Sequence, residues 1–259
     1  MGTFDGFRHR RMEDRDVWVG GSGPAIVVIH EMPGLHPGVV EFARRLVAAG
    51  FTAYLPSLFG RPGEPFRQGE ILRSLAGICV SREFSLFALG RTSPAVARLR
   101  RIAATAHEEC GGPGVGAVGM CFTGGFALAM AVDDRVLAPV LSQPGMPAPL
   151  GARRRAAVDM SDADLARVRR RVAEDGLCAL GLRFTNDGSV PAERFATLRR
   201  ELGDGFIAVE IDSSPGNPHG IPTSAHSVLT NELVDEPGHP TRAALDRVIA
   251  FYRERLQPL

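Results

Sequence analysis

The chain has 259 residues, of which 44% are hydrophobic and 23% are charged, and this balance is typical of a globular protein with a sizeable core. The composition excludes a disordered, collagen-like or coiled-coil chain, and no run of about eighteen apolar residues predicts a membrane span. Because the formal net charge is only +1, the sequence does not indicate binding to nucleic acid or to an anionic membrane.

Arginine supplies all 30 basic residues, which excludes a Schiff-base lysine and the lysine of a Walker-type phosphate loop. Cys79, Cys110, Cys121 and Cys178 form no CxxC motif, so neither a disulfide framework nor a metal site is expected. Residues 1–20 are charged and lack the apolar core of a secretory signal. We therefore expect a cytoplasmic protein that uses no metal and no organic cofactor.

Short apolar runs alternate with amphipathic segments along the chain. The runs that predict buried strands are 25–29, 51–55, 114–120, 136–141, 178–184 and 206–211. The segments that predict helices are 38–49, 93–109, the stretch after Ser161, 191–202 and 241–256. This alternation predicts a single α/β domain over residues 1–259, with a mostly parallel central sheet and helices on both faces.

Three further segments carry local expectations. Ser161 and Asp164 resemble a capping box in which Asp replaces the usual Glu, so a helix is expected to begin there. The arginine clusters at 153–155 and 167–171 are interpreted as solvated helix faces. Residues 57–92 fit neither pattern, and we expect them to form a cap or an irregular excursion.

Polar residues follow the predicted strands in a suggestive order. Glu31 comes just after the first strand, Cys121 follows the third, Asp187 follows the fifth, and His226 lies in the long loop after the last. In a parallel sheet these positions meet at the carboxyl edge, where ligands bind. The order cysteine, acid, histidine is that of a nucleophile, an orienting acid and a base.

The segment Gly-Met-Cys-Phe-Thr-Gly-Gly at 119–125 predicts a nucleophile elbow centred on Cys121. Gly119 supplies one small residue at the usual spacing, whereas Thr123 holds the place of the second and Gly124 follows it. A thiol needs a base to react efficiently at neutral pH, and His226 is predicted to provide it. The alternative is a buried structural cysteine before a packing helix.

Asp187 is predicted to orient His226, although Asn-Asp-Gly-Ser also suits a turn or a helix cap. Asp204 and Asp212 compete with it as the acid. His219 competes with His226 as the base, but Gly-Asn-Pro-His-Gly predicts a turn with an exposed ring.

The chain resembles the dienelactone hydrolase family of α/β-hydrolases over roughly residues 24–256. The motifs that carry the resemblance are His-Glu-Met-Pro-Gly-Leu at 30–35, Tyr-Leu-Pro-Ser-Leu-Phe-Gly at 54–60, the elbow at 119–125, Asp187 with Val-Pro at 190–191, and Ala-His-Ser at 225–227. The resemblance implies an α/β-hydrolase fold and a catalytic triad of Cys121, His226 and Asp187.

The resemblance also implies further roles. Glu31 would pair with the cysteine and help to generate the thiolate, and the backbone N–H groups of Met32 and Phe122 would form the oxyanion hole. Arg82, or another arginine of residues 61–91, would bind a substrate carboxylate. The family has another such arginine four residues after the histidine, where this chain has Thr230.

The expected function is hydrolysis of a small-molecule ester or lactone, dienelactone-like, through a cysteine thioester. A thioesterase or small-ester esterase of the same fold would use the same triad with a different pocket. A binding protein on a hydrolase scaffold, or one that uses Cys121 as a redox sensor, remains the alternative from another class.

Overall fold

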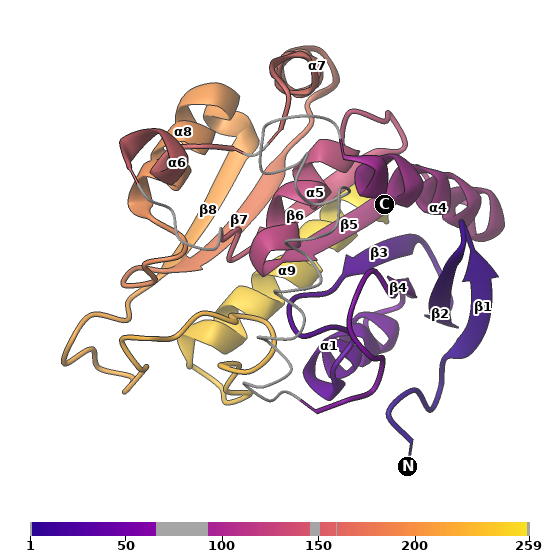
Figure 1. Ribbon diagram of the computed structural model, residues 1–259, viewed down its shortest axis with the longest axis horizontal. Coiled ribbons are helices and arrows are strands. Elements are labelled where there is room, and N and C mark those ends of the chain that lie inside the picture. Colours follow the sequence, from indigo (N-terminus) through magenta and orange to yellow (C-terminus); the bar gives the residue numbers. More distant parts are fainter. Residues whose placement is uncertain (1, 66–92, 146–150, 159, 258–259) are drawn as a thin grey trace.

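The computed structural model describes residues 2–65, 93–145, 151–158 and 160–257 (Figure 1). The described strands form one sheet in the order β1-β2-β4-β3-β5-β6-β7-β8. Their bounds are β1 Arg8–Met12, β2 Arg15–Gly21, β3 Ala25–Ile29, β4 Thr52–Pro56, β5 Val115–Met120, β6 Val136–Ser142, β7 Ala179–Phe184 and β8 Phe206–Ile211. From β4 to β8 every neighbouring pair is parallel, which confirms the predicted mostly parallel sheet.

The six predicted strands agree with the structure to within one residue at each end. β3 and β8 have the predicted bounds, and every residue of β3, β4, β5 and β7 is buried. Burial on both faces explains why these strands appear in the sequence as continuous apolar runs.

The sequence analysis missed the hairpin formed by β1 and β2. These strands are antiparallel, and β2 continues antiparallel to β4. Glu13 and Asp14 connect them with φ of 49° and 58°, the left-handed pair that suits a tight hairpin. β1 is the outermost strand of the sheet and reads Arg-His-Arg-Arg-Met, so it has no apolar run that would have indicated a strand.

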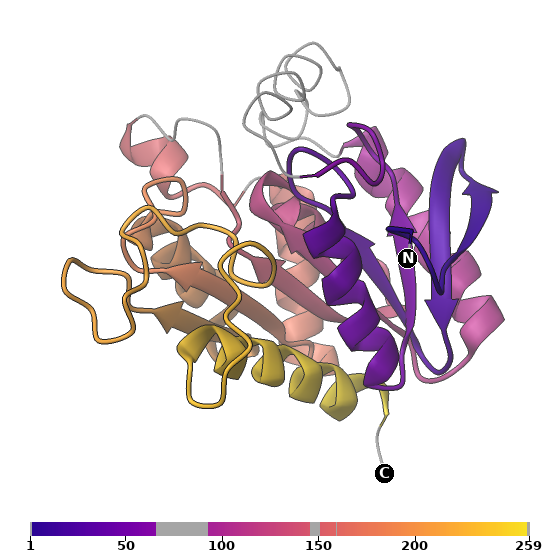
Figure 2. The same cartoon turned by 90° about the horizontal axis from the view of Figure 1, so that it is seen from below.

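Helices cover both faces of the sheet, as predicted. The described helices are α1 Pro37–Ala48, α4 Pro94–Cys110, α5 Gly124–Met130, α6 Ala152–Arg155, α7 Asp162–Asp175, α8 Ala192–Leu202 and α9 Pro240–Leu256, with short 3₁₀ turns at Cys121–Thr123 and Gly203–Gly205. Residues of α4, α5, α7 and α8 share one core cluster, and residues of α1 and α9 share the other. Figure 2 shows α1 and α9 on the same side of the sheet.

α7 confirms one local expectation and corrects another. The Ser161 hydroxyl accepts a hydrogen bond from the Asp164 N–H at 3.1 Å, as the capping pattern predicted. The expectation of a fully solvated arginine face is wrong, because Arg171 is buried. Its guanidinium donates to the carbonyl oxygens of Ala131, Asp133 and Val136, so it closes the turn before β6.

Of the segment predicted to form a cap, residues 57–65 form turns and irregular chain, and residues 66–92 lie outside the described residues. The helices that the structure describes are all too short or too polar to cross a membrane. Because β3, β5, β7 and β8 run in the same direction, the segments that follow them meet at one edge of the sheet. That edge carries the predicted site.

Candidate active site

Cys121 stands on a sharp turn between β5 and α5. Its φ is 57°, a left-handed conformation that is uncommon for a residue with a side chain. A Cβ atom at Gly119 would lie 2.0 Å from the carbonyl oxygen of Thr123, so only glycine fits there. The predicted elbow is thus the local structure that this segment adopts, and it leaves the free thiol of Cys121 partly exposed.

Thr123, which holds the place of an expected glycine, fits because its side chain is used inside the turn. The hydroxyl accepts from the Met120 N–H at 3.0 Å and lies 2.7 Å from the Met120 carbonyl oxygen. It also lies 3.1 Å from the carbonyl oxygen of Ile29 at the end of β3. The Thr123 side chain therefore connects the elbow to the neighbouring strand β3. Gly124 is the small residue at which the elbow comes close to Pro144, because a Cβ at this position would lie 2.7 Å from Pro144.

Asp187 and His226 form a hydrogen-bonded pair beside the elbow. The Nδ1 atom of His226 lies 2.6 Å from Oδ2 of Asp187, which is buried in the turn after β7. Both the N–H and the hydroxyl of Ser189 donate to the other oxygen, Oδ1, at 2.9 Å and 2.6 Å. Burial alone would raise the pKa of Asp187, but the hydrogen bonds and charge of His226 and the donors of Ser189 lower it. Asp187 is therefore held as a carboxylate.

Cys121 lies near the ring of His226, because its thiol is among the groups that raise the pKa of His226. Burial disfavours the charged ring and would lower its pKa. The hydrogen bonds and the charges of Asp187 and Cys121 outweigh that effect and raise the pKa of His226 to about 11. With Nδ1 facing Asp187, the other ring nitrogen is left for the sulfur. The arrangement suits an imidazole that holds and returns a proton at Cys121.

Glu31 is buried at the end of β3, and its carboxylate faces several donors. Oε2 accepts from the Gln143 amide at 3.0 Å and from the Ser227 hydroxyl at 2.8 Å. Oε1 faces His36 Nε2 at 3.3 Å and the Thr230 hydroxyl. Burial would raise the pKa of Glu31, but the hydrogen bond and charge of His36, helped by Thr230, lower it. Within the described residues, the Cys121 thiol is not among the hydrogen-bond partners of Glu31.

Met32 and Phe122, the residues predicted to form the oxyanion hole, follow neighbouring strands of the sheet. Met32 follows Glu31 at the carboxyl end of β3, and Phe122 follows Cys121 at the end of β5, which is the next strand in the sheet. The ring of Phe122 packs against that of Phe59, with centroids 5.3 Å apart. The two backbone N–H groups therefore belong to the segments that follow adjacent strands at the carboxyl edge of the sheet.

The competing residues lie elsewhere. His219 is exposed and its ring contacts His239, with centroids 5.5 Å apart. Asp212 accepts from the Ser214 N–H, and Asp204 lies in the 3₁₀ turn before β8. Neither aspartate contacts His226 in the described residues. Arg82, the proposed ligand of a substrate carboxylate, lies outside the described residues.

Sequence reasoning missed the side chains that hold the site together. Ser189 supports Asp187, Gln143 and Ser227 support Glu31, and the Glu232 carboxylate accepts from the Ser227 N–H at 2.6 Å. Only Ser189 had a local signal, since a hydroxyl two residues after an aspartate in a turn commonly bonds back to it. Among the described residues, no group of three or more histidine, cysteine, aspartate or glutamate side chains is placed to hold a metal ion.

Several known proteins are similar to this chain in sequence or in fold. Carboxymethylenebutenolidase from Pseudomonas sp. (strain P51) is 29% identical over 117 residues, which cover 44% of this chain and 46% of that protein. The match thus spans about half the length of that relative. A dienelactone hydrolase-like promiscuous phosphotriesterase from metagenomic libraries has a TM-score of 0.63 at 19% identity, covering 97% of this chain and 99% of its own. A dienelactone hydrolase from Anabaena variabilis has a TM-score of 0.59 at 18% identity, again covering 97% and 99%.

These structural likenesses show the α/β-hydrolase fold that the sequence predicted. A model of the dienelactone hydrolase family matches residues 15–254. Because that match covers most of the chain, the protein belongs to the dienelactone hydrolase family.

Proposed function

We propose that the protein hydrolyses a small-molecule ester or lactone through a thioester on Cys121. The observation that supports this most strongly is the ring of His226, whose Nδ1 lies 2.6 Å from the buried carboxylate of Asp187 and whose pKa is raised by Asp187 and by the nearby thiol of Cys121. The left-handed φ of Cys121 also supports the proposal. Strained backbone of this kind is found mainly at functional sites, where the surrounding structure holds it in place.

In the proposed reaction His226 takes the thiol proton, and the sulfur of Cys121 attacks the carbonyl carbon of the substrate. The carbonyl oxygen becomes an oxyanion, which the N–H groups of Met32 and Phe122 stabilise; a donor of this kind contributes about 3 kcal/mol in acyl-transfer enzymes. The intermediate collapses, and the departing alcohol takes the proton from His226 and leaves a thioester. Water, deprotonated by His226, then attacks the thioester and releases the acid and the thiol.

Asp187 is proposed to hold the ring with its Nδ1–H toward Oδ2 and to stabilise the imidazolium that forms. Glu31 is kept in the proposed site as a group that supports the reacting residues. A direct action on the thiol, as the family resemblance implies, would require its carboxylate to leave the donors that hold it.

The contacts of Thr230 favour a neutral substrate. Thr230 stands where the resemblance implies an arginine for a substrate carboxylate, and its hydroxyl donates to Glu31. A dienelactone-like acid would therefore depend on another cation, for which Arg82 remains the prediction. Phe59 packs on Phe122 beside the thiol and adds an apolar surface. A small-ester esterase or thioesterase is thus the second candidate.

The state of the cysteines is relevant to the cellular compartment of the protein. Cys110, Cys121 and Cys178 are free cysteines in the structure. Free thiols are the usual state in a reducing compartment, so a cytoplasmic location remains our proposal.

The test compares Cys121→Ala with Cys178→Ala, a matched loss of another partly exposed free thiol. Turnover of p-nitrophenyl acetate and mass spectrometry of an acyl adduct are measured for both. We expect Cys121→Ala to lose turnover and adduct, and Cys178→Ala to keep both. Wild-type turnover in Cys121→Ala would contradict the proposal, and a wild-type protein that turns over no activated ester would favour a binding or redox role.

A further inference from the structure

Gln143 occupies a strained position at the carboxyl edge of the sheet, directly after β6. It is buried, and its φ of 37° is left-handed, although glutamine has a full side chain. Such a conformation is strained for a residue with a side chain, and it persists when the surrounding contacts determine it. The contacts of Gln143 therefore indicate what this position does.

The side-chain amide of Gln143 bridges two functional segments. Nε2 donates to Oε2 of Glu31 at 3.0 Å, and Oε1 accepts from the Val228 N–H at 3.4 Å and from the Ser142 hydroxyl. Glu31 immediately precedes Met32, and Val228 lies two residues after His226. One amide thus joins the turn of the proposed oxyanion hole to the loop of the proposed base.

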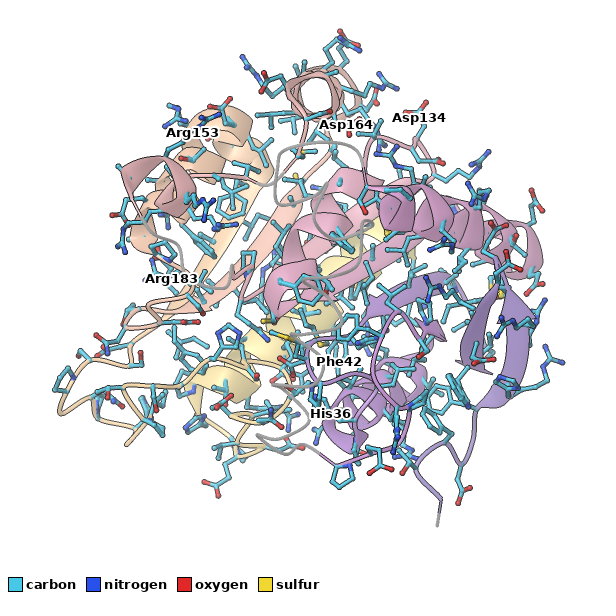
Figure 3. The ribbon with its side chains drawn as sticks, in the orientation of Figure 1. His36, Phe42, Asp134, Arg153, Asp164 and Arg183 are labelled. Atoms are coloured by element: carbon cyan, nitrogen blue, oxygen red, sulfur yellow. The ribbon has the colours of Figure 1, made fainter. Side chains whose placement is uncertain are left out.

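Glu31 completes the bridge on its other side. The hydroxyls of Ser227 and Thr230, which flank Val228, both donate to its carboxylate. His36, the N-cap of α1 labelled in Figure 3, faces Oε1 with Nε2 while its Nδ1 accepts from the Gly38 N–H, so Nε2 is assigned as the donor to Oε1. Both carboxylate oxygens therefore act as acceptors.

The orientation of the Gln143 amide is fixed by the same logic. If the amide were flipped, its NH₂ group would face the Val228 N–H, and two donors would meet. Its oxygen would at the same time face Oε2 of Glu31, placing two acceptors together. The pair of Glu31 and Gln143 therefore has one satisfied arrangement.

The loop that carries His226 needs such support. Residues 212–239, between β8 and α9, are all described and contain no helix or strand. Backbone turns and buried apolar residues hold part of this loop, and Asp187 holds the His226 ring itself. Glu31 and Gln143 add side-chain bonds to Ser227, Val228 and Thr230, on the segment directly after His226.

We propose that Gln143 is a positioning residue that, through Glu31, sets the loop of His226 and the Met32 turn over Cys121. This inference rests on the proposed function, because it assigns the role of His226 and Met32 from it. Glu31 in this arrangement acts on the geometry of the base and of the oxyanion hole, and not on the sulfur itself.

The decisive variant is Gln143→Met, which keeps the length of the side chain and removes the three hydrogen bonds that the amide makes with Glu31, Val228 and Ser142. Thr230→Val removes one donor to Glu31 and disturbs the fold less. Thr52→Val is the matched control, because the Thr52 hydroxyl is also buried and donates to a carbonyl oxygen, that of Gly23, far from Cys121 in the sheet. For each, kcat and KM with p-nitrophenyl acetate and the rate of Cys121 alkylation by iodoacetamide at pH 7 are measured, with melting temperature as the folding control.

We expect Gln143→Met to lower kcat by about 10- to 100-fold with little change in KM, since small misplacements of reacting groups cost rates of this order. Alkylation should slow as well, because His226 no longer assists the thiol. Thr230→Val should show the same pattern more weakly, and Thr52→Val should match wild type.

Two results would overturn the proposal. One is wild-type kcat in a folded Gln143→Met variant. The other is unchanged or faster alkylation in that variant, which would mean that the released Glu31 acts on the thiol directly. Cys121→Ala in the same assay distinguishes a failure of the proposed function from a failure of this inference. If Cys121→Ala keeps turnover, the proposed function is wrong. If Cys121→Ala is inactive, the result for Gln143→Met tests the positioning role alone.

Discussion

Replacing Asp187 by asparagine changes one proton position in the site while keeping the shape of the side chain. In the wild type both Ser189 donors bind Oδ1, and His226 Nδ1–H binds Oδ2. An asparagine would keep its oxygen on the two Ser189 donors and turn its NH₂ group toward His226. Nδ1 would then have to accept, and the ring proton would move to Nε2, where it blocks proton transfer from Cys121.

The expected loss follows from that wrong tautomer. An asparagine in place of the triad aspartate lowers turnover by about 10⁴-fold in a serine protease, and we expect about 10³- to 10⁴-fold in kcat/KM here, or ~4–5 kcal/mol of transition-state stabilisation. The assay is hydrolysis of p-nitrophenyl acetate with the melting temperature as folding control. Asp212→Asn is the matched control, because Asp212 also follows a strand and accepts from a backbone N–H two residues on. A folded Asp187→Asn enzyme within threefold of wild type would refute the reasoning.

Two further predictions concern stability. Gly119→Ala would place its Cβ 2.0 Å from the Thr123 carbonyl oxygen, so urea unfolding should show that the free energy of unfolding falls by about 3 kcal/mol or more. Gly188→Ala is the control and should stay near wild type, because no atom lies within 4 Å of the added Cβ. Equal stabilities of the two variants would show that the elbow tolerates a side chain. Glu109 is bound by Arg10 and Tyr54, which lower its pKa to about 2 from an ordinary 4.5. A lowered pKa stabilises the fold above pH 4.5 and this contribution is lost as the pH falls toward 2, so the stability gap between wild type and Glu109→Gln should close over that window; a gap that widens on acidification would contradict the assignment.

The sequence predicted the parallel strands well because their physics is local. A strand such as β3, which is buried on both faces, is apolar at every position, so its five residues are enough to predict it from the sequence. β1 and β2 were missed for the converse reason: β1 is an edge strand whose side chains are mostly charged, and its pairing depends on β2 and not on its own composition.

In the candidate site, too, residues with a local sequence signal could be predicted, whereas residues whose roles depend on distant contacts could not. Cys121 was visible because the elbow demands glycine beside it, and Asp187 and His226 follow from chain order. The roles of Gln143 and Thr230 depend on contacts with Glu31, which is more than a hundred residues away in both cases. No local pattern contains such a contact. Arg171 was misjudged likewise, because the carbonyl oxygens that enclose it belong to the turn before β6.

The charged edge strand has a consequence for how copies of this protein meet. An open sheet edge offers unpaired backbone groups to any neighbouring chain, and edge-to-edge growth begins with such pairing. Here β1 carries Arg8, Arg10 and Arg11, of which Arg10 is paired with Glu109 and Arg11 with Asp16, so two copies that paired through this edge would bring strongly charged and salt-bridged strands together. We expect charged side chains on the edge strand to disfavour edge-to-edge pairing in concentrated solution, and added salt to weaken this effect.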